Sequence, residues 1–360
     1  SMLRHPQRLF NKKLLNILPF RNNQERNALL KSLSFQWMFI FTFNESFWTN
    51  RDVIILYILT FVVLIFIIFY YRTRTLRRLN KILREKENTR QELSQQREEL
   101  ISKNQSITDS IHYAKRIQQA LLPSERHFKT LIPDSFILYM PKDIVSGDFY
   151  WINSWNDKIY VAAIDCTGHG VPGAFMSFIG YELFRNITIG EKIEDPAEIL
   201  NSLNRRLIST LGKNEESPDL HDGMDISLCV FNKRTRTMEY AGAFNPLYII
   251  RNNKLEEIKA DRYTVGLVND PEMSFSKHII SLEDVEMIYL FTDGYTDQFG
   301  GPEGKKYKFR RFRHLLLTIH KFSVHKQKLF LHDSIEKWRG NLEQVDDILV
   351  IGVNPRCLFE

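Results

Sequence analysis

The segment at residues 164–173, IDCTGHGVPG, constrains the fold of this chain more than any other. Asp165 closes a run of small apolar residues at 161–164, and two glycine-rich turns follow it directly. A carboxylate at the end of a buried strand, above a tight turn that glycine permits, is a way of presenting a ligand to a hard metal ion. The segment therefore predicts a sheet whose edge carries an oxygen ligand.

Three further acidic sites have the same surroundings. They are SGD at 146–148, FTDG at 291–294 and VDDI at 345–348, and each lies beside apolar, strand-like sequence. Taken singly, each of these Asp residues is as readily a turn or cap residue. Taken jointly, the sites favour one metal cluster that a sheet fold assembles from distant parts of the chain.

Short apolar runs with turn residues between them follow residue 133 and predict strands. We expect strands at 136–140, 158–164, 226–232, 237–241, 247–251, 287–291 and 348–353, and helices at 173–187, 195–211 and 307–321. Runs of strands with helices between them favour layered α+β packing.

Six sequence words occur in a fixed order: SGDFYW, DCTGHGVPGAFMS, DGMDISLC, AGAFNPLYII, FTDGYTDQFGG and QVDDILVIGV. Together they closely resemble the SpoIIE-like branch of the metal-dependent (type-2C, PPM) protein serine/threonine phosphatases, over roughly residues 106–353. The resemblance implies an α+β fold, a β-sandwich flanked by helices with metal ions between the sheet edges. It places this phosphatase domain at 123–360.

The resemblance also implies a ligand set for two Mn²⁺ or Mg²⁺ ions, which oxygen ligands select over zinc or copper. Asp165 would bridge the ions, with the backbone carbonyl of Cys166 as a further ligand. Asp293 and Asp346 would complete one site, and Asp148 would serve the second, mostly through water. Two such ions can hold a bridging water, lower its pKa and clamp a phosphate for in-line attack.

Other residues near these words are weaker candidates. Asp347 is the less expected ligand of its pair, because the family's ligand usually precedes the second polar residue. Gly168 and Gly170 allow close approach of the backbone to phosphate. His169 could donate to phosphate or cap the following helix, and the structural role is favoured.

Asp222 and Asp225, in HDGMDIS, could contact a third metal or the substrate, and a surface turn is equally open for Asp222. No arginine near Asp148 matches the phosphate-binding arginine of the eukaryotic relatives. This absence implies a low affinity for phosphate without a protein partner or metal loading.

Two other phosphatase chemistries do not fit. Cys166 is followed by TGHGVPGA, without an arginine that would close a phosphate loop. Asp293 and Asp297 are four apart, unlike the Asp-x-Asp nucleophile of haloacid-dehalogenase-type enzymes. Cys166, Cys229 and Cys357 stand at unrelated spacings, which excludes a disulfide framework and a zinc pattern and suits a reducing compartment.

An apolar stretch at 53–71 has Thr60 as its only polar member. It is long enough to cross ~30 Å of hydrocarbon as a helix; the alternative is a buried core helix. Arg72 and further basic residues follow at once, so the positive-inside rule predicts a single span of the bacterial inner (cytoplasmic) membrane with the C-terminal part in the cytoplasm. Residues 1–52 have no assigned role, and a sensor could precede them.

Residues 72–122 contain no Pro or Gly and are rich in good helix formers. Their heptad pattern favours a parallel dimeric coiled coil, hence a homodimer, with a lone solvated helix as the alternative. Several a positions are polar: Arg90, Arg97, Asn104 and Gln118. Pro123 should end the helix. Residues 107–123 are similar to the helical lead-in of SpoIIE-like domains, a regulatory element in that family.

The net charge of +6 arises largely before residue 90, so we interpret it as membrane-related and expect no nucleic-acid partner. A basic cluster at 305–313 is interpreted as a solvated face. The sequence thus predicts a membrane-anchored, metal-dependent phosphatase that acts on phosphoserine or phosphothreonine of a protein partner. By family analogy the substrate could be an anti-sigma-factor antagonist. The alternative is a weak or inactive phosphatase-fold scaffold that acts through the coiled coil.

Overall fold

The computed structural model describes residues 27, 31, 51–212, 222–267 and 274–359. Its contacts divide the chain into two compact units, Ser1–Asn104 and Gln105–Glu360. The predicted N-terminal segment, residues 1–52, lies almost wholly outside the described residues. The described part of the first unit is mainly the beginning of helix α4 (Arg51–Leu121).

Helix α4 contains an 18-residue window with a mean hydropathy of 3.1, and none of that window is buried among the described residues. By length and composition it is therefore a candidate membrane span. The helix ends at Leu121, two residues before Pro123, as the sequence predicted. Proline disfavours the helical conformation in the residue before it, and in a helix interior it lacks the N–H that the helix would need.

The second unit contains two five-stranded antiparallel sheets. The first has the order β1 (Ser135–Met140), β12 (Ile348–Val353), β9 (Val285–Phe291), β6 (Leu247–Arg251) and β7 (Lys254–Ile258). The second has the order β2 (Phe149–Trp155), β3 (Lys158–Cys166), β4 (Met224–Asn232), β5 (Thr237–Ala243) and β8 (His278–Ser281). A small hairpin of β10 (Phe299–Gly300) and β11 (Lys305–Lys306) stands apart from them.

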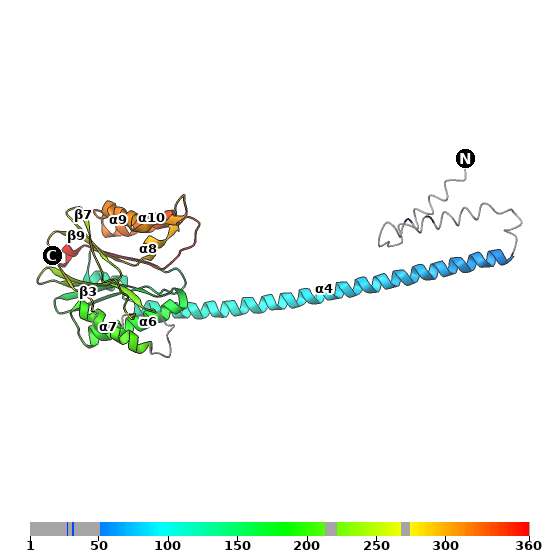
Figure 1. The fold of residues 1–360 in the computed structure, drawn as a ribbon, viewed down its shortest axis with the longest axis horizontal. Helices are drawn as coiled ribbons and strands as arrows, with labels where there is room; N and C mark the ends of the chain where they lie inside the picture. The colour runs from blue at the N-terminus through cyan, green and yellow to red at the C-terminus, as the bar shows by residue number, and fades with distance from the viewer. Residues whose placement is uncertain (1–26, 28–30, 32–50, 213–221, 268–273, 360) are drawn as a thin grey trace. The chain divides into compact units, whose positions relative to one another are not determined.

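Helices cover the outer face of each sheet (Figure 1). Helix α6 (Gly170–Arg185), the π-turn η1 (Asn186–Gly190) and α7 (Pro196–Thr210) pack on the second sheet. Helices α9 (Lys308–Ile319) and α10 (Val324–Arg339) pack on the first sheet, beside the short α8 (Gly294–Asp297). Two short helices, α5 (Glu125–Leu131) and η2 (Pro355–Leu358), complete the unit.

The layers follow from alternation along the strands. In β3, Ile159, Val161 and Ala163 point into a core shared with the first sheet, whereas Tyr160, Ala162 and Ile164 pack under α6 and α7. Both faces of each central strand are therefore apolar, as a buried strand requires. The predicted mixed helix and sheet fold is confirmed.

The predicted elements differ from the observed ones in detail. Strands β6 and β12 have the predicted bounds. Helix α6 begins at Gly170, three residues earlier than predicted, because Pro172 is tolerated in the first turn of a helix. Strands β2, β7 and β8 and helix α10 were not predicted. Strands β7 and β8 are short edge strands with mostly exposed side chains, so they lack the apolar signal.

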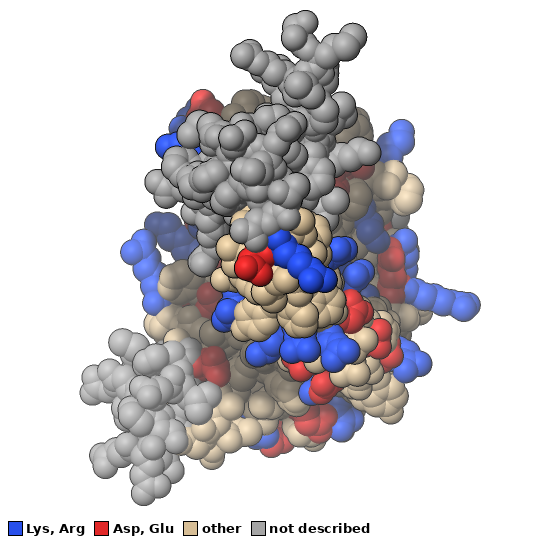
Figure 2. Space-filling model, turned by 90° about the vertical axis from the view of Figure 1, so that its right-hand side faces the viewer, with Lys and Arg blue, Asp and Glu red and all other residues tan. Residues whose placement is uncertain are grey.

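The basic cluster at 305–313 is largely paired. Lys305 contacts Glu303, Lys306 contacts Asp297 and Arg313 contacts Glu257. Arg311 lies over the ring of Trp338. On the face drawn in Figure 2, Lys and Arg side chains are interspersed with Asp and Glu.

Candidate metal centre

The second sheet aligns three carboxylates at one end. The last fully paired row across β2, β3, β4 and β5 is Phe149, Ile164, Ile226 and Ala243. One residue beyond this row stand Asp148 ahead of β2, Asp165 near the end of β3 and Asp225 near the start of β4. Asp165 and Asp225 are direct cross-strand partners. Antiparallel register therefore brings together residues that are far apart in the sequence.

The first sheet contributes the remaining carboxylates. Asp293 follows β9 after one residue, and Asp346 and Asp347 precede β12, which pairs with β9. The two sheets meet at Thr292, whose Oγ1 donates to Asp148 Oδ2 over 2.7 Å. The end of β9 and the start of β12 therefore lie against the acidic end of the second sheet.

Burial and mutual repulsion set the charge state of this cluster. Burial raises the pKa of Asp148 well above its usual range, and the charges of Asp165 and Asp347 raise it further. Burial likewise raises the pKa of Asp165, with Asp293, Asp346 and Asp225 adding to the effect. A side-chain hydrogen bond with Asp148 opposes this shift at Asp165.

Asp293 and Asp225 stand at the rim of the cluster. Burial, then the charges of Asp297 and Asp346, raise the pKa of Asp293 to about 6, although the residue reaches solvent. Lys306 lowers it only in part. Burial raises the pKa of Asp225, and the hydroxyl of Thr264, which donates to Asp225 Oδ1 over 2.6 Å, opposes that rise.

Asp347 differs from its neighbour Asp346 in what it binds. Asp347 is buried, and its two oxygens accept the backbone N–H groups of Lys142 and Gly147, both over 2.7 Å. Its carboxylate therefore fixes the loop that leads to Asp148. Asp346 is half-buried, and its Oδ1 accepts the backbone N–H of Asp347 over 2.8 Å.

Gln118 on α4 fixes the same loop from the other side. Its Nε2 donates to the carbonyl of Ser146 over 2.6 Å and to Ser177 Oγ over 2.9 Å, and its Oε1 accepts the N–H of Ser146 over 3.1 Å. It is the buried residue of α4. The heptad pattern predicts only a polar a position for Gln118, and this polar residue within an apolar stripe is the signal that the sequence offers.

Close backbone packing completes the loop. A Cβ on Gly147 would lie 2.3 Å from the carbonyl oxygen of Gly168 and 3.3 Å from that of Cys166. The Cys166 carbonyl therefore points toward the segment that ends in Asp148. Gly168 and Gly170 have positive φ values of 84° and 63°, which most other residues adopt only with strain.

His169 occupies the N-cap position of α6, but its side chain makes no capping hydrogen bond. The capping role that we favoured is therefore wrong. Its Nδ1 instead lies 2.7 Å from Asp143 Oδ2, and its Nε2 lies 2.8 Å from Lys142 Nζ. With Nδ1 donating to the carboxylate, Nε2 is free to accept from the ammonium. Lys142 and Asp143, which the sequence did not single out, thus orient His169 at the mouth of the site.

Asp222 lies in the loop ahead of β4, whereas Asp225 is within β4. Of the two, Asp225 is the one whose charge acts on Asp165 and Asp293. The neighbouring Gly223 donates its N–H to Thr167 Oγ1 over 2.9 Å and accepts the N–H of Thr167 over 3.0 Å. The structure therefore brings Asp225 to the cluster.

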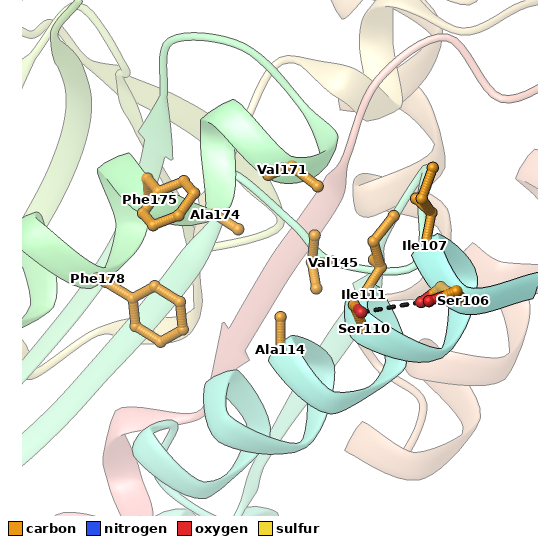
Figure 3. A pocket seen from close by; sticks show the side chains of 10 residues that line it. All are labelled: Ser106, Ile107, Ser110, Ile111, Ala114, Val145, Val171, Ala174, Phe175 and Phe178. Carbon is orange, nitrogen blue, oxygen red and sulfur yellow. Dashed lines mark hydrogen bonds between the residues drawn. The ribbon is translucent and has the colours of Figure 1, made fainter. Parts of the chain in front are cut away.

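An apolar groove of about 410 Å³ borders the site. Figure 3 shows the end of α4 facing the start of α6 across it, with Val145 between them. Its lining residues are Ser106, Ile107, Ser110, Ile111, Ala114, Val145, Val171, Ala174, Phe175 and Phe178. Val145 directly precedes the loop that leads to Asp148, so groove and site share a wall.

The donors suit a hard divalent cation. Carboxylate and carbonyl oxygens are the ligands of Mg²⁺ and Mn²⁺, and buried carboxylates with raised pKa values gain most from a cation. Within the described ranges, no three His, Cys, Asp or Glu side chains converge closely enough to hold a metal ion as they stand. The match between these residues and a divalent metal ion therefore rests on the chemistry of the donor atoms and on electrostatics.

The fold defines the class of protein. The SiaA-PP2C domain of Pseudomonas aeruginosa superposes with a TM-score of 0.63 and is 29% identical, covering 70% of this chain and 98% of that one. A PP2C phosphatase domain with a regulatory fragment of SpoIIE from Bacillus subtilis shares the fold, with a TM-score of 0.50 and 18% identity, covering 61% of this chain and 62% of that one. The second unit has the PP2C phosphatase fold.

Residues 156–356 match the family model described as Stage II sporulation protein E (SpoIIE). The chain belongs to the SpoIIE family. Phosphoserine phosphatase RsbU of Bacillus subtilis (strain 168) is 27% identical over 198 residues, which are 54% of this chain and 55% of RsbU. The chain thus spans about half the length of this curated relative. The predicted resemblance to the SpoIIE-like branch of the PPM-type phosphatases is confirmed. Phosphatases of this class depend on metal ions, generally Mn²⁺ or Mg²⁺.

Proposed function

We propose that this protein is a membrane-anchored, metal-dependent phosphatase that hydrolyses phosphoserine or phosphothreonine on a protein partner in signal transduction. The observation that supports it most is that carboxylates from two sheets lie near enough for their charges to act on one another: Asp148 is buried, Asp165 and Asp346 are partly buried, and Asp293 reaches solvent. Carboxylates gathered without a balancing positive charge lower the stability of the fold when no cation is bound. The SpoIIE family assignment points to the same activity.

In this proposal Asp165, the Cys166 carbonyl, Asp293 and Asp346 hold one ion, and Asp148 and Asp165 hold a second. When bound, a pair of Mn²⁺ or Mg²⁺ ions supplies an activated water and neutralises phosphate charge. Thr292 keeps Asp148 oriented by donating to one oxygen, which leaves the other oxygen available. Asp347 keeps Gly147 and Lys142 in place through its two accepted N–H bonds.

The phosphate would enter beside the partly buried Lys142 and the exposed His169, at the mouth of the site. The ammonium of Lys142, which gives one N–H to His169 Nε2, keeps further N–H donors for a phosphate next to an otherwise acidic surface. Asp143 holds the His169 ring in place by accepting from Nδ1. Asp225 is the cross-strand partner of Asp165, so a further metal or substrate contact would lie there, with Asp222 in the loop that precedes it.

The test is turnover of p-nitrophenyl phosphate and a phosphoserine peptide by residues 105–360 and by the full chain, with Mn²⁺ or Mg²⁺ added. Turnover that chelation removes would support the proposal. A folded protein that is inactive with every metal would instead favour a weak or inactive scaffold that acts through α4. A phosphorylated anti-sigma-factor antagonist is the protein substrate to try first.

We also propose that residues 53–71 anchor the chain in the bacterial inner membrane, with the phosphatase domain in the cytoplasm and residues 72–104 paired as a parallel coiled coil. Support comes from the hydropathy of α4 and the basic residues that follow its apolar part. Membrane fractionation of the full chain tests the anchor. Leu93 and Leu100 are exposed and stand three residues after the a positions Arg90 and Arg97, which makes them d positions of the heptad pattern. Disulfide cross-linking of Leu93→Cys and Leu100→Cys tests the pairing.

A further inference from the structure

Phe244, between β5 and β6, has a backbone conformation that bulky residues rarely adopt. Its φ is +61°, and the N–H of Asn245 donates to the carbonyl of Ala243 over 2.6 Å. A hydrogen bond between residues i and i+2 around a central residue of positive φ defines the strained form of γ-turn. Glycine would adopt this turn at lower cost, so a phenylalanine here needs another reason.

Neighbouring groups fix the turn. The N–H of Phe244 donates to the carbonyl of Asp261 over 2.8 Å, and the hydroxyl of the buried Tyr240 donates to the carbonyl of Asn245 over 2.7 Å. The ring gains little burial in return, because Phe244 is 59% exposed. Packing of the domain core therefore does not explain the residue.

The register explains its position. Ala243 belongs to the last paired row of the second sheet, with Ile226 and Ile164. Phe244 therefore lies one residue beyond it, in the row of Asp225 and Asp165. Adjacent strands are about 4.8 Å apart, which puts the backbone of Phe244 about 10 Å from that of Asp165. An exposed aromatic residue thus stands at the rim of the proposed metal centre.

We propose that Phe244 is a docking residue for the substrate, and binds an apolar side chain near the phosphorylated residue. This inference rests on the proposed phosphatase function. An extended peptide advances about 3.3 Å per residue, so the apolar side chain would lie about three positions from the phosphoserine or phosphothreonine. Aromatic rings supply large apolar contact area at low entropic cost.

The composition of the site agrees with such a contact. The carboxylate cluster gives the phosphate no favourable charge of its own, and Lys142 and His169 stand only at its mouth. Binding energy from a part of the substrate remote from the phosphate can orient the reacting group. Phe244 would thereby favour phosphoproteins with a suitably placed apolar residue over free phosphate esters.

The experiment compares the full chain with Phe244→Ala, Phe244→Tyr and Phe244→Gly, loaded with Mn²⁺. The substrates are p-nitrophenyl phosphate and phosphoserine peptides with Leu or Ser three positions before or after the phosphoserine. We expect the wild type to prefer one Leu peptide about tenfold in kcat/KM, mainly through KM. Phe244→Ala should lose that preference and retain turnover of p-nitrophenyl phosphate, and Phe244→Tyr should keep the preference.

Phe244→Gly separates docking from a structural role. It should raise the melting temperature, since glycine relieves the strain, and still lose the peptide preference. Phe330→Ala, which removes a half-exposed aromatic ring from α10, is the matched control and should leave the peptide preference unchanged. An unchanged peptide preference in Phe244→Ala would overturn the proposal. So would a parallel loss of activity on p-nitrophenyl phosphate, because that would show general damage to the site.

Fluorescence anisotropy with the same peptides keeps the test independent of turnover. If Phe244→Ala weakens binding of the Leu peptide about tenfold, the result supports docking even without catalysis. Equal binding by both proteins would overturn docking. Absence of turnover by the wild type on every substrate, by contrast, would count against the proposed phosphatase function.

Discussion

Thr292 and Asp148 are 144 residues apart in sequence, and their side chains are joined by a 2.7 Å hydrogen bond inside the protein. The same Thr292 Oγ1 accepts the N–H of Leu349 on β12 over 3.1 Å. One hydroxyl therefore connects strand β9, strand β12 and the carboxylate that precedes strand β2. It couples the pairing of the first sheet to the position of an acidic group on the second.

Replacing Thr292 tests this coupling. Thr292→Val keeps the shape of the side chain but leaves the buried N–H of Leu349 and the oxygen of Asp148 without their partner. We expect a loss of about 1–3 kcal/mol in the free energy of unfolding and weaker Mn²⁺ binding. Urea denaturation and metal titration of turnover are the measurements. Thr292→Ser keeps the hydroxyl and should lose much less stability and metal affinity. Equal losses in the two variants would contradict the coupling through the Thr292 hydroxyl.

The raised pKa of Asp148 predicts how stability depends on pH in the metal-free protein. The folded state keeps this proton to a higher pH than the unfolded chain, whose aspartates titrate near 3.9. Between that value and the raised pKa the folded state binds more protons, so the free energy of unfolding falls as pH rises.

Thermal melts with chelator at about pH 5 and pH 7.5 measure the effect. The wild type should lose stability between them, and Asp148→Asn, which has no proton to release, should lose less. Added Mn²⁺ should raise the melting temperature of the wild type most at the higher pH, because the carboxylate ligands must be deprotonated to bind the metal ion. A flat or rising profile for the chelated wild type would show that the cluster is not held protonated.

Asp165 is expected to be indispensable for activity. Asp165→Ala removes the carboxylate that interacts with Asp148, Asp293, Asp346 and Asp225. We expect kcat/KM to fall at least about a hundredfold. The metal-free fold should persist or become more stable, because mutual repulsion is relieved. Asp157→Asn, at an exposed position in the turn between β2 and β3, is the control and should remain active; a fully active Asp165→Ala variant would refute the mechanism.

The sequence predicted the strands and helices whose residues follow a regular local pattern of apolar and turn residues. Strands β6 and β12 have short apolar runs between turn residues, and their bounds agreed with the prediction. Helix α10 was missed although it has 16 residues, because VHKQKLFLHDSIEKWR mixes charged and apolar residues without a wide apolar face. Strand β2 was not predicted: its first four residues are buried and its last three, which include two polar residues, are not, so the apolar run is short.

Residues that act through long-range contacts could not be predicted in the same way. Gln118, Lys142 and Asp143 gain their roles only when α4, the loop after β1 and the start of α6 come together. Polar side chains of this kind are common on surfaces. Nothing in a single sequence distinguishes the buried Gln118 from the exposed Gln119 beside it, except the 3.6-residue period of the apolar stripe.

This neighbouring pair offers a controlled test of the loop that leads to Asp148. Gln118→Ala removes three hydrogen bonds and leaves the polar backbone atoms of Ser146 buried without them. We expect a loss of about 1–3 kcal/mol in stability and a higher Mn²⁺ requirement. Gln119→Ala, one residue later on the exposed side of the helix, should change neither the stability nor the Mn²⁺ requirement. Similar metal titrations for the two variants would show that Gln118 does not position the site.

The close contact between Gly147 and Gly168 predicts that a larger residue at position 147 lowers activity. In Gly147→Ala the new methyl group would lie 2.3 Å from the Gly168 carbonyl oxygen, a backbone atom that cannot rotate away. The loop must shift, and the bond from the Gly147 N–H to Asp347 must lengthen with it. A displacement of about 1 Å at a reacting group can cost about a hundredfold in rate, so kcat should fall far more than stability. Gly190→Ala is the matched control, since its nearest neighbour, Asn186 Oδ1, is 4.0 Å away. If both variants keep wild-type turnover and metal affinity, the two glycine-rich loops are not packed as closely as the structure describes, and the position of Asp148 is set by Thr292 and the β2 strand alone.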